Sequence, residues 1–182
     1  EEKDKLKPII ENDLDKSRFT VQLESLESDD QPMIITQSEF MRRYKEMAAT
    51  GGGMNFYGEM PDSFNLVVNT AHPLVQRILK NGNEACAEKT SPLYAAIEEL
   101  EKKRTSLKGD KKESDLPEAI KDELKKIESD LSAKQNEKKS VYEEYSKTQN
   151  DVKQLVDLTL LSNNLLKGEA LSQFIKRSYD MI

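Results

Sequence analysis

Few side chains in this sequence could perform acid–base, nucleophilic or metal chemistry. His72 is the only histidine, which excludes a metal site built on several imidazoles and leaves a Ser-His-Asp triad one candidate base. It precedes Pro73 at an expected strand-to-helix junction, a position that favours a turn or helix-capping role over catalysis. A hydrolase that uses His72 would also need a nucleophile in a pocket. Cys86 is the only cysteine, which excludes internal disulfides, and no sequence neighbour is expected to activate it.

Three successive glycines, Gly51–Gly53, resemble part of a phosphate-binding loop. No Lys-Ser or Lys-Thr pair follows them, and they end an expected helix instead of preceding one, so this interpretation is rejected. The many carboxylates lie on solvated helical faces, where no acid–base pair stands out. The sequence therefore predicts no catalytic, cofactor-binding or metal-binding residue, and a chain that is not an enzyme by itself.

Composition narrows the class of protein further. The chain has 182 residues, of which 36% are hydrophobic and 34% charged. This balance favours elongated helical architecture, because narrow apolar seams need fewer hydrophobic residues than a large compact core. The net charge of −6 argues against a nucleic-acid partner. No apolar run approaches the roughly 20 residues of a membrane helix, so no membrane partner is expected.

The first half of the chain mixes helical and strand patterns. We expect a helix over 2–13, strands over 18–26 and 33–36 that form a hairpin or meander, a helix over 39–49, a strand over 64–69 and a helix over 73–80. Asn81-Gly82-Asn83 is expected to end the last of these helices. The pattern predicts an α+β fold, with flanking helices around a small three-stranded, mainly antiparallel sheet.

The segment 92–145 is charged and has apolar residues at heptad spacing. One arm of the expected antiparallel hairpin carries Leu93, Ile97, Leu100 and Leu107, with Arg104 in a core position; Gly109-Asp110 breaks it and Pro117 starts the second arm. The second arm repeats Ile120, Leu124, Ile127, Leu131, Lys134, Lys138, Val141 and Tyr145. Its two core lysines weaken the seam. The register continues through Val152 and Leu155, which allows this arm to run unbroken into the next helix.

The last forty or so residues are strongly apolar. A leucine-rich helix over 154–166 is expected to end at Gly168, and a final helix covers 169–182. Leucines cover nearly the whole circumference of the first helix. One flank can be buried against its own domain, and the second flank then needs another partner, which in a small domain is easily another subunit. A two-fold interface, in which both helices meet a second copy and form a four-helix bundle, solves this. The alternative is that both helices pack only within the monomer. The candidate interface residues are Leu155, Leu158, Leu161, Leu165, Leu171, Phe174, Ile175 and Ile182.

Methionine and aromatic side chains gather in a second segment. Met41, Tyr44 and Met47 lie on adjacent turns of the helix over 39–49. Met54, Phe56 and Tyr57 follow the glycines. Flexible, polarisable methionines suit surfaces that bind varied apolar partners. Ordinary core packing is the alternative explanation for the same spacing.

Two blocks of the sequence resemble a known family. SEFMRRYKEMAAT with the following GGGMNFYGEMPDSFNLVVNTAHPLVQRIL, and VKQLVDLTLLSNNLLKGEALSQFIKRSYDMI at the end, resemble the C-terminal domain of bacterial heat-shock protein 90 chaperones of the HtpG type, in their Bacteroidetes form. The resemblance implies a cytoplasmic, homodimeric, ATP-driven chaperone. ATP and Mg²⁺ would bind a separate N-terminal domain, and this segment would hold no cofactor. The resemblance also makes Met41, Tyr44 and Met47 candidate contacts for unfolded or partly folded client proteins.

The resemblance predicts three regions. Residues 1–83 form the α+β subdomain, 84–148 the charged hairpin and 149–182 the dimerisation helices. The hairpin departs from many relatives, which have a shorter connection there. A different class of protein stays open as the alternative, namely a structural coiled-coil scaffold that oligomerises through 92–145.

Overall fold

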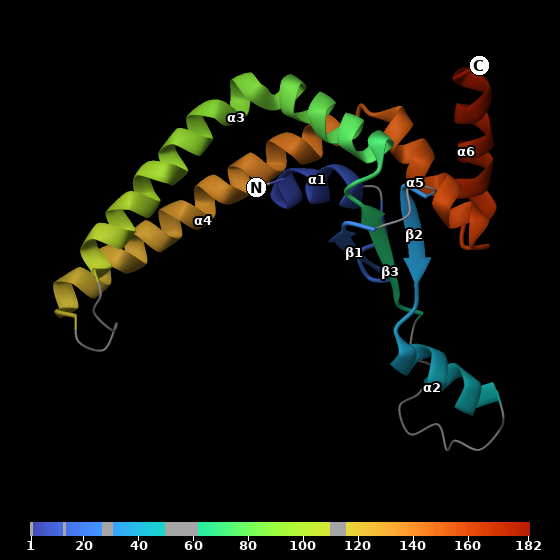
Figure 1. Cartoon of the computed structure of the whole chain (residues 1–182), viewed down its shortest axis with the longest axis horizontal. Coiled ribbons are helices and arrows are strands. Elements are labelled where there is room, and N and C mark those ends of the chain that lie inside the picture. The colour runs from blue at the N-terminus through green and yellow to red at the C-terminus, as the bar shows by residue number, and fades with distance from the viewer. Residues whose placement is uncertain (1, 13, 27–30, 50–61, 110–115) are drawn as a thin grey trace.

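The computed structural model describes residues 2–12, 14–26, 31–49, 62–109 and 116–182. Its central body is a small sheet covered by helix α1 (Glu2–Glu11) and by the roots of two long helices (Figure 1). Those two helices project from the body as a hairpin, and α5 and α6 lie at the opposite end of the molecule. The predicted α+β class is confirmed.

The sheet is mixed. Strands β1 (Phe19–Glu24), β2 (Met33–Thr36) and β3 (Phe64–Asn69) lie in the order β1-β3-β2. β3 pairs parallel to β1 and antiparallel to β2. The predicted pairing of the first two strands as a hairpin or meander is therefore wrong, and only one of the two strand pairings is antiparallel.

The burial of β3 explains its central position. Leu66, Val67 and Val68 are all buried, so this strand is covered on both faces, which is the usual state of a strand inside a sheet. β1 instead alternates between buried and exposed residues and forms one edge of the sheet. Phe19 and Phe64 are register partners, and their rings stack with centroids 5.5 Å apart. The more apolar third strand thus displaces the hairpin that sequence proximity favours.

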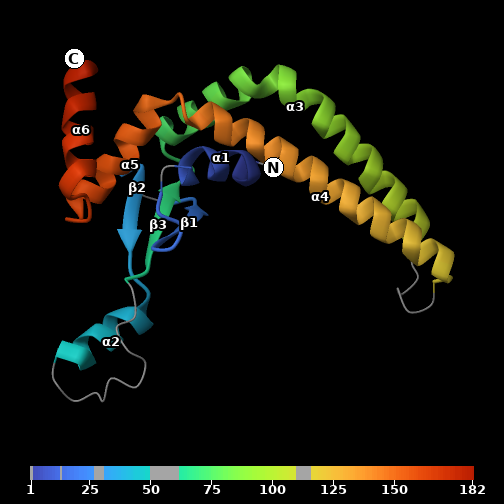
Figure 2. The same cartoon turned by 180° about the vertical axis from the view of Figure 1, so that it is seen from behind.

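Helix α1 closes the core between the sheet and the long helices, as seen from behind in Figure 2. Its apolar face, Leu6, Ile9 and Ile10, is buried almost completely. These side chains belong to one cluster with residues of β1, β3, α3, α4 and α5. The N-terminal helix thus joins the root of the hairpin to the rest of the domain.

Helix α3 (Pro73–Lys108) is a single helix. The prediction that Asn81-Gly82-Asn83 ends it near residue 80 is wrong. Val75, Ile78, Leu79 and Cys86 continue one buried stripe past these residues, and such tertiary packing overrides the weak helix propensity of Gly and Asn. The predicted boundary between residues 83 and 84 lies within this helix, and the division into three regions stays a prediction.

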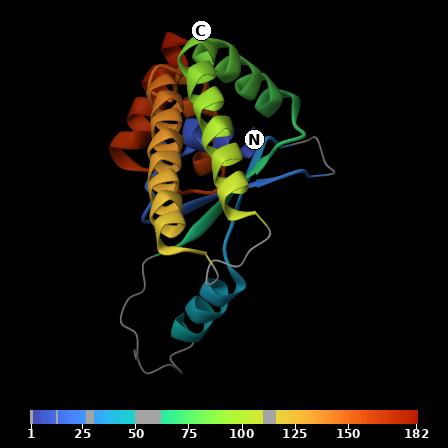
Figure 3. The same ribbon diagram turned by 90° about the vertical axis from the view of Figure 1, so that its left-hand side faces the viewer.

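Helix α4 (Glu118–Ser146) runs back along α3, and the two helices lie side by side in Figure 3. Their far ends share a separate small cluster, formed by Ile97, Ile127 and Leu131 with Leu100 and Leu107. The heptad prediction is confirmed there, except that Arg104 is exposed. Lys138 is half-buried, with its ammonium 4.8 Å from the ring centroid of Tyr94. A cation–π contact thus accommodates one of the two core lysines.

The expected continuity of α4 into the next helix is wrong. The Ser146 and Thr148 hydroxyls bond to the carbonyls of Glu143 and Tyr145, respectively. Such side-chain bonds compete with helix continuation. Helix α5 (Asn150–Ser162) begins after this turn, and helix α6 (Gly168–Asp180) follows it. Helix α2 (Glu39–Ala49), which lies at the bounds predicted for it, is placed beyond the carboxyl end of β2, away from α5 and α6 (Figure 1).

Candidate functional site

Helix α5 buries one side against the domain and leaves another open. Val152, Val156 and Leu160 are buried within the main core cluster. Leu158, on the other side of the helix, is 53% exposed. The width of the leucine face in the sequence therefore corresponds to a buried side and a solvent-facing side.

The end of α5 differs from the prediction. Asn164, with φ of 58°, adopts the left-handed conformation that ends the helix. The backbone N–H groups of Leu165 and Asn164 donate to the carbonyls of Leu160 and Leu161 over 2.9 and 3.0 Å, which is the Schellman arrangement. Gly168 was expected to end this helix, and that prediction is wrong, because Gly168 is the first residue of α6.

Helix α6 has no buried residue, and its two sides differ in exposure. Leu171 and Phe174 pack against the main core cluster and are partly buried. Ile175 and Tyr179, four residues apart on the adjoining face, are 44% and 74% exposed. One exposed strip of α6, along Ile175 and Tyr179, is therefore apolar and in contact with solvent, whereas the exposed residues Ser172, Gln173 and Lys176 elsewhere on the helix are polar.

The predicted interface residues divide into two groups. Those partly buried against the chain's own core are Leu155, Leu161, Leu165, Leu171 and Phe174. Those that are exposed are Leu158, Ile175 and Ile182. Sequence reasoning missed Tyr179 and Met181, which are also exposed near the end of the chain. The spacing of four residues from Ile175 to Tyr179 was the signal that could have identified Tyr179.

A shallow groove of about 210 Å³ adjoins the exposed part of α5. Its apolar lining comes from the first turns of α3, from α5 and from the end of the chain, namely Leu74, Ile78, Leu155, Leu158 and Met181. Arg77, Asp151 and Gln154 also line it. We call the exposed apolar residues Leu158, Ile175, Tyr179, Met181 and Ile182 the C-terminal surface.

Polar groups join α6 to α5. The Arg177 guanidinium donates to the Asp157 carboxylate, and these side chains are only 16% and 13% exposed. Gln154 Nε2 donates to the Ser178 hydroxyl over 2.5 Å. The Ser178 hydroxyl in turn donates to the carbonyl of Phe174. We call these two side-chain pairs the α5–α6 polar contact.

Helix α2 presents a second apolar group. Met47 is 60% exposed, and Phe40, which was not among the predicted residues, is 66% exposed. Tyr44 is partly buried and Met41 is buried. The ion pairs Arg42–Glu46 and Arg43–Glu39 lie along the same helix. Three predicted client contacts, Met54, Phe56 and Tyr57, lie outside the described residues, as do Gly51–Gly53.

His72 and Cys86, the two residues considered for catalysis, lie at a helix cap and in the core, respectively. His72 is the N-cap of α3, and its Nδ1 accepts from the Leu74 N–H over 3.1 Å, as the capping prediction stated. Cys86 is 3% exposed, and burial raises the pKa of its thiol, so a reactive thiolate is disfavoured. Within the described ranges, no group of three or more His, Cys, Asp or Glu residues is placed to hold a metal ion.

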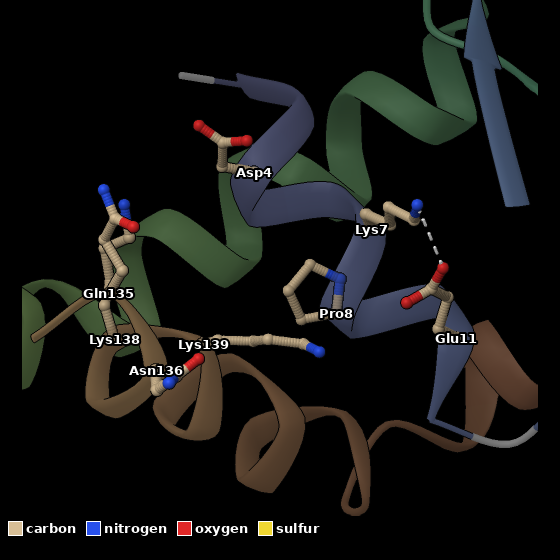
Figure 4. Close-up of a pocket in the computed structure, with 8 residues that line it drawn as sticks. All are labelled: Asp4, Lys7, Pro8, Glu11, Gln135, Asn136, Lys138 and Lys139. Atoms are coloured by element: carbon tan, nitrogen blue, oxygen red, sulfur yellow. Dashed lines mark ion pairs between the residues drawn. The ribbon is translucent and has the colours of Figure 1, made fainter. Parts of the chain in front are cut away.

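A charged pocket of about 370 Å³ lies between α1 and α4 (Figure 4). Its charged groups already have partners: Lys7 pairs with Glu11 at 3.4 Å, and Lys139 pairs with Glu143 at 3.5 Å. Lys138, which also lines the pocket, makes the cation–π contact described above. The pocket carries neither His, Cys, Ser nor Thr as a nucleophile or base.

Among the described residues, none of the helices combines the length and the apolar composition that spanning a membrane requires.

Comparison with known proteins gives relatives of one kind. The chain is 44% identical over 172 residues to the chaperone protein HtpG of Bacteroides thetaiotaomicron and 43% identical to that of Bacteroides fragilis. It is 38% identical to the chaperone protein HtpG of Porphyromonas gingivalis. No protein-family model and no solved structure matches the chain. These alignments cover 92–93% of the chain but only 25% of each relative. Over nearly its whole length, the chain is thus homologous to a segment that makes up one quarter of the HtpG chaperones of Bacteroidetes.

Proposed function

We propose that this chain is the C-terminal homodimerisation module of an ATP-dependent HtpG chaperone. The observation that carries the proposal is the C-terminal surface, where large apolar side chains of α5, α6 and the last two residues face solvent. Exposing such side chains to water is unfavourable, and contiguous exposed apolar surface commonly marks a site of protein association. The homology to chaperones named HtpG supports the same function.

A second copy of the same chain is the partner that we propose for this surface. Helix α6 packs on its own domain through Leu171 and Phe174 and leaves the face of Ile175 and Tyr179 uncovered. Two copies related by a two-fold axis can cover this face with the same helices of the other copy, which closes the assembly at two chains. The resulting arrangement is a four-helix bundle.

The oligomeric state of paired variants tests the proposal. Leu158→Glu with Ile175→Glu places two carboxylates on the C-terminal surface, while both side chains are sufficiently exposed for the monomer to fold. We expect sedimentation equilibrium to show a dimer for the unmodified chain and a monomer for this variant. The matched control is Phe40→Glu with Met47→Glu, which changes two similarly exposed apolar residues on α2 and should stay dimeric.

Two results would contradict the proposal. One is an unmodified chain that sediments as a monomer at concentrations of tens of micromolar, since a standard interface of about 1,600 Å² should hold there. The other is a dimer that survives the Leu158 and Ile175 changes intact. Leu161→Glu with Phe174→Glu is a less selective test, because both side chains also pack against the chain's own core.

We also propose that α2 contacts client proteins. Phe40 and Met47 are the exposed apolar side chains of this helix, and Tyr44 is partly exposed. Met41 is buried, so its expected role is to hold the helix in place. The flexible Met47 side chain can adapt to apolar segments of different shape. In the full-length chaperone, ATP and Mg²⁺ would bind a separate N-terminal domain, and this module would bind no cofactor.

A further inference from the structure

We infer that the α5–α6 polar contact sets the orientation of α6 and thereby positions the apolar face that meets the second copy. The inference rests on the proposed dimerisation and adds the residues that determine its geometry. Asp157 and Arg177 are positioning residues in this view, with Gln154 and Ser178 as the second pair. None of these four residues needs to touch the partner.

The α5–α6 polar contact lies at the end of α6 that is far from the turn joining the two helices. The chain reverses between α5 and α6 through residues 163–167. Arg177 and Ser178 lie in the last turn of α6, and they meet Asp157 and Gln154, which precede the last turn of α5. The contact therefore holds α6 at the end farthest from the connecting turn. Leu171 and Phe174 pack α6 against the core through non-directional apolar contacts. The polar contact adds directional bonds in the last turn, which restrict pivoting of the helix about the connecting turn.

The α5–α6 polar contact leaves some of its buried polar atoms without partners. Arg177 Nε and Gln154 Oε1 are buried and have no hydrogen-bond partner among the described residues. Leaving such atoms unpaired is unfavourable, and replacing a buried ion pair by apolar residues of similar volume is often neutral or stabilising. A gain in stability therefore does not explain why polar side chains occupy the α5–α6 contact. Directional bonds instead specify one arrangement of two helices, as a buried polar residue does in a coiled coil.

The strength of the dimer depends on how often α6 adopts the orientation that the second copy binds. If α6 samples several orientations, only the fraction that presents Ile175 and Tyr179 correctly is competent to dimerise. The apparent dissociation constant then rises by the inverse of that fraction, so a competent population of about one tenth weakens the dimer about ten-fold. The apolar residues of the C-terminal surface would be unchanged throughout.

An apolar replacement separates positioning from simple stabilisation. In Asp157→Leu with Arg177→Leu, the packing volume is largely kept and the directional bond is lost. We expect a folded protein with an unchanged or raised melting temperature, and a dimer dissociation constant raised about ten-fold in sedimentation velocity. The charge exchange Asp157→Arg with Arg177→Asp restores an ion pair and should recover most of the affinity. Glu98→Gln with Lys102→Gln removes an exposed ion pair of α3 and is the control that should change neither value.

A second readout follows α6 without reference to the dimer. Spin labels at exposed Glu88 of α3 and Lys176 of α6, in a Cys86→Ala background and diluted with unlabelled protein, report the distance between body and helix. We expect a narrow distance distribution for the parent, a broad one for the double leucine variant and a narrow one for the charge exchange.

The outcomes separate the two proposals. A double leucine variant with a narrow distribution and an unchanged dissociation constant overturns the positioning role, even when Leu158→Glu with Ile175→Glu still abolishes the dimer. A parent chain that is monomeric overturns the proposed dimerisation instead, while the distance distribution still tests whether the contact orients α6. If the double leucine variant does not fold, the charge exchange decides, and a broad distribution there counts against the inference.

Discussion

Ile9 of α1 occupies the space in which a side chain at Gly82 of α3 would lie. A Cβ built on Gly82 would be 2.7 Å from Ile9 Cδ1 and 3.4 Å from Tyr145 Cε1 of α4. The first of these distances is too short for a carbon–carbon contact. The absence of a side chain at one position in the first third of α3 therefore lets α1 and α4 pack against it together.

Gly82→Ala is expected to lower the free energy of unfolding, although alanine favours a helix by about 1 kcal/mol over glycine. Ile9 is 1% exposed and has little room to move, and overpacking a core costs about 1–3 kcal/mol. Urea denaturation should show a net loss of about 1 kcal/mol. In an Ile9→Val background, which removes Cδ1, the same change should be neutral or stabilising. Equal losses in both backgrounds would contradict this account. Asn81→Ala, at an exposed position of the same helix, raises helix propensity without overpacking and should therefore be neutral or stabilising.

The same residue shows what the sequence could and could not predict. Within the described residues, periodicity located each of the strands and most of the helices, because apolar spacing reflects which face is buried. It failed at Gly82, where a local signal for helix termination competes with contacts from residues distant in the chain. It also failed for the sheet order, since nothing local shows that β3 lies between β1 and β2.

The candidate site, like the fold, could be predicted from the sequence only where local pattern decides the outcome. The leucine-rich tail predicted the region of the C-terminal surface, but exposure distinguishes Leu158 from Leu161, and exposure depends on the tertiary structure. The pairing of Asp157 with Arg177 joins residues twenty positions apart. No helical spacing within one element relates them, so sequence pattern alone could not reveal it.

The turn between α5 and α6 makes a prediction about Asn164. Its φ of 58° suits glycine better than any residue with a side chain. Asn164→Ala should lower the free energy of unfolding by about 1 kcal/mol, because alanine lacks the local hydrogen bonding that lets asparagine adopt this conformation. Asn164→Gly should be neutral or slightly stabilising. Thermal or urea denaturation checks both changes, with exposed Asn136 in α4 as the control site for Asn→Ala. Equal effects of Ala and Gly at residue 164 would argue against the Schellman turn.

Cys86 should react slowly with alkylating reagents while the protein is folded. Burial raises the pKa of its thiol above the ordinary value of 9.0, which the nearby Lys89 only partly offsets. Because the thiolate is the nucleophile, we expect iodoacetamide to modify the thiol at about pH 8 only through unfolding, and rapidly in denaturant. Mass spectrometry over time measures both rates. Similar rates with and without denaturant would contradict the burial of this side chain.

The raised pKa of Cys86 also predicts an alkaline loss of stability. The folded chain holds the thiol proton more tightly than the unfolded chain does. This contribution to stability is fully present below the unfolded pKa, near 9.0, and is lost as the pH rises through the higher folded value. Burial raises the pKa of the Tyr145 hydroxyl as well, so its contribution has the same sign. Denaturation curves of Cys86→Ala should therefore decline less steeply above this pH than those of the parent, and parallel declines would exclude the thiol as a cause.

Changes on α2 should separate client binding from dimerisation. Met47→Asp replaces a side chain that is 60% exposed. We expect binding of a chemically denatured client to weaken by about ten- to a hundred-fold, since burying a methionine-sized side chain contributes about 1.5–3 kcal/mol, while the sedimenting mass stays the same. Fluorescence anisotropy of a labelled client measures the affinity, with Glu46→Gln as a control on the same helix. Loss of the dimer in Met47→Asp, or unchanged client affinity, would contradict the role of α2.

Truncation of the α3–α4 hairpin distinguishes the chaperone module from a coiled-coil scaffold. Among the described residues, every large hydrophobic side chain of 93–146 is at least partly buried. The far cluster around Ile97 and Ile127 is separate from the main core. Deleting residues 96–136 and joining the ends with a short Gly-Ser linker removes that cluster. It leaves Tyr94, whose hydroxyl lies 3.5 Å from that of Tyr142, at the root of the hairpin. We expect the shortened chain to remain folded and to sediment as a dimer, because the C-terminal surface is intact. A folded but monomeric product would instead favour the scaffold, in which the heptads of the hairpin hold the copies together.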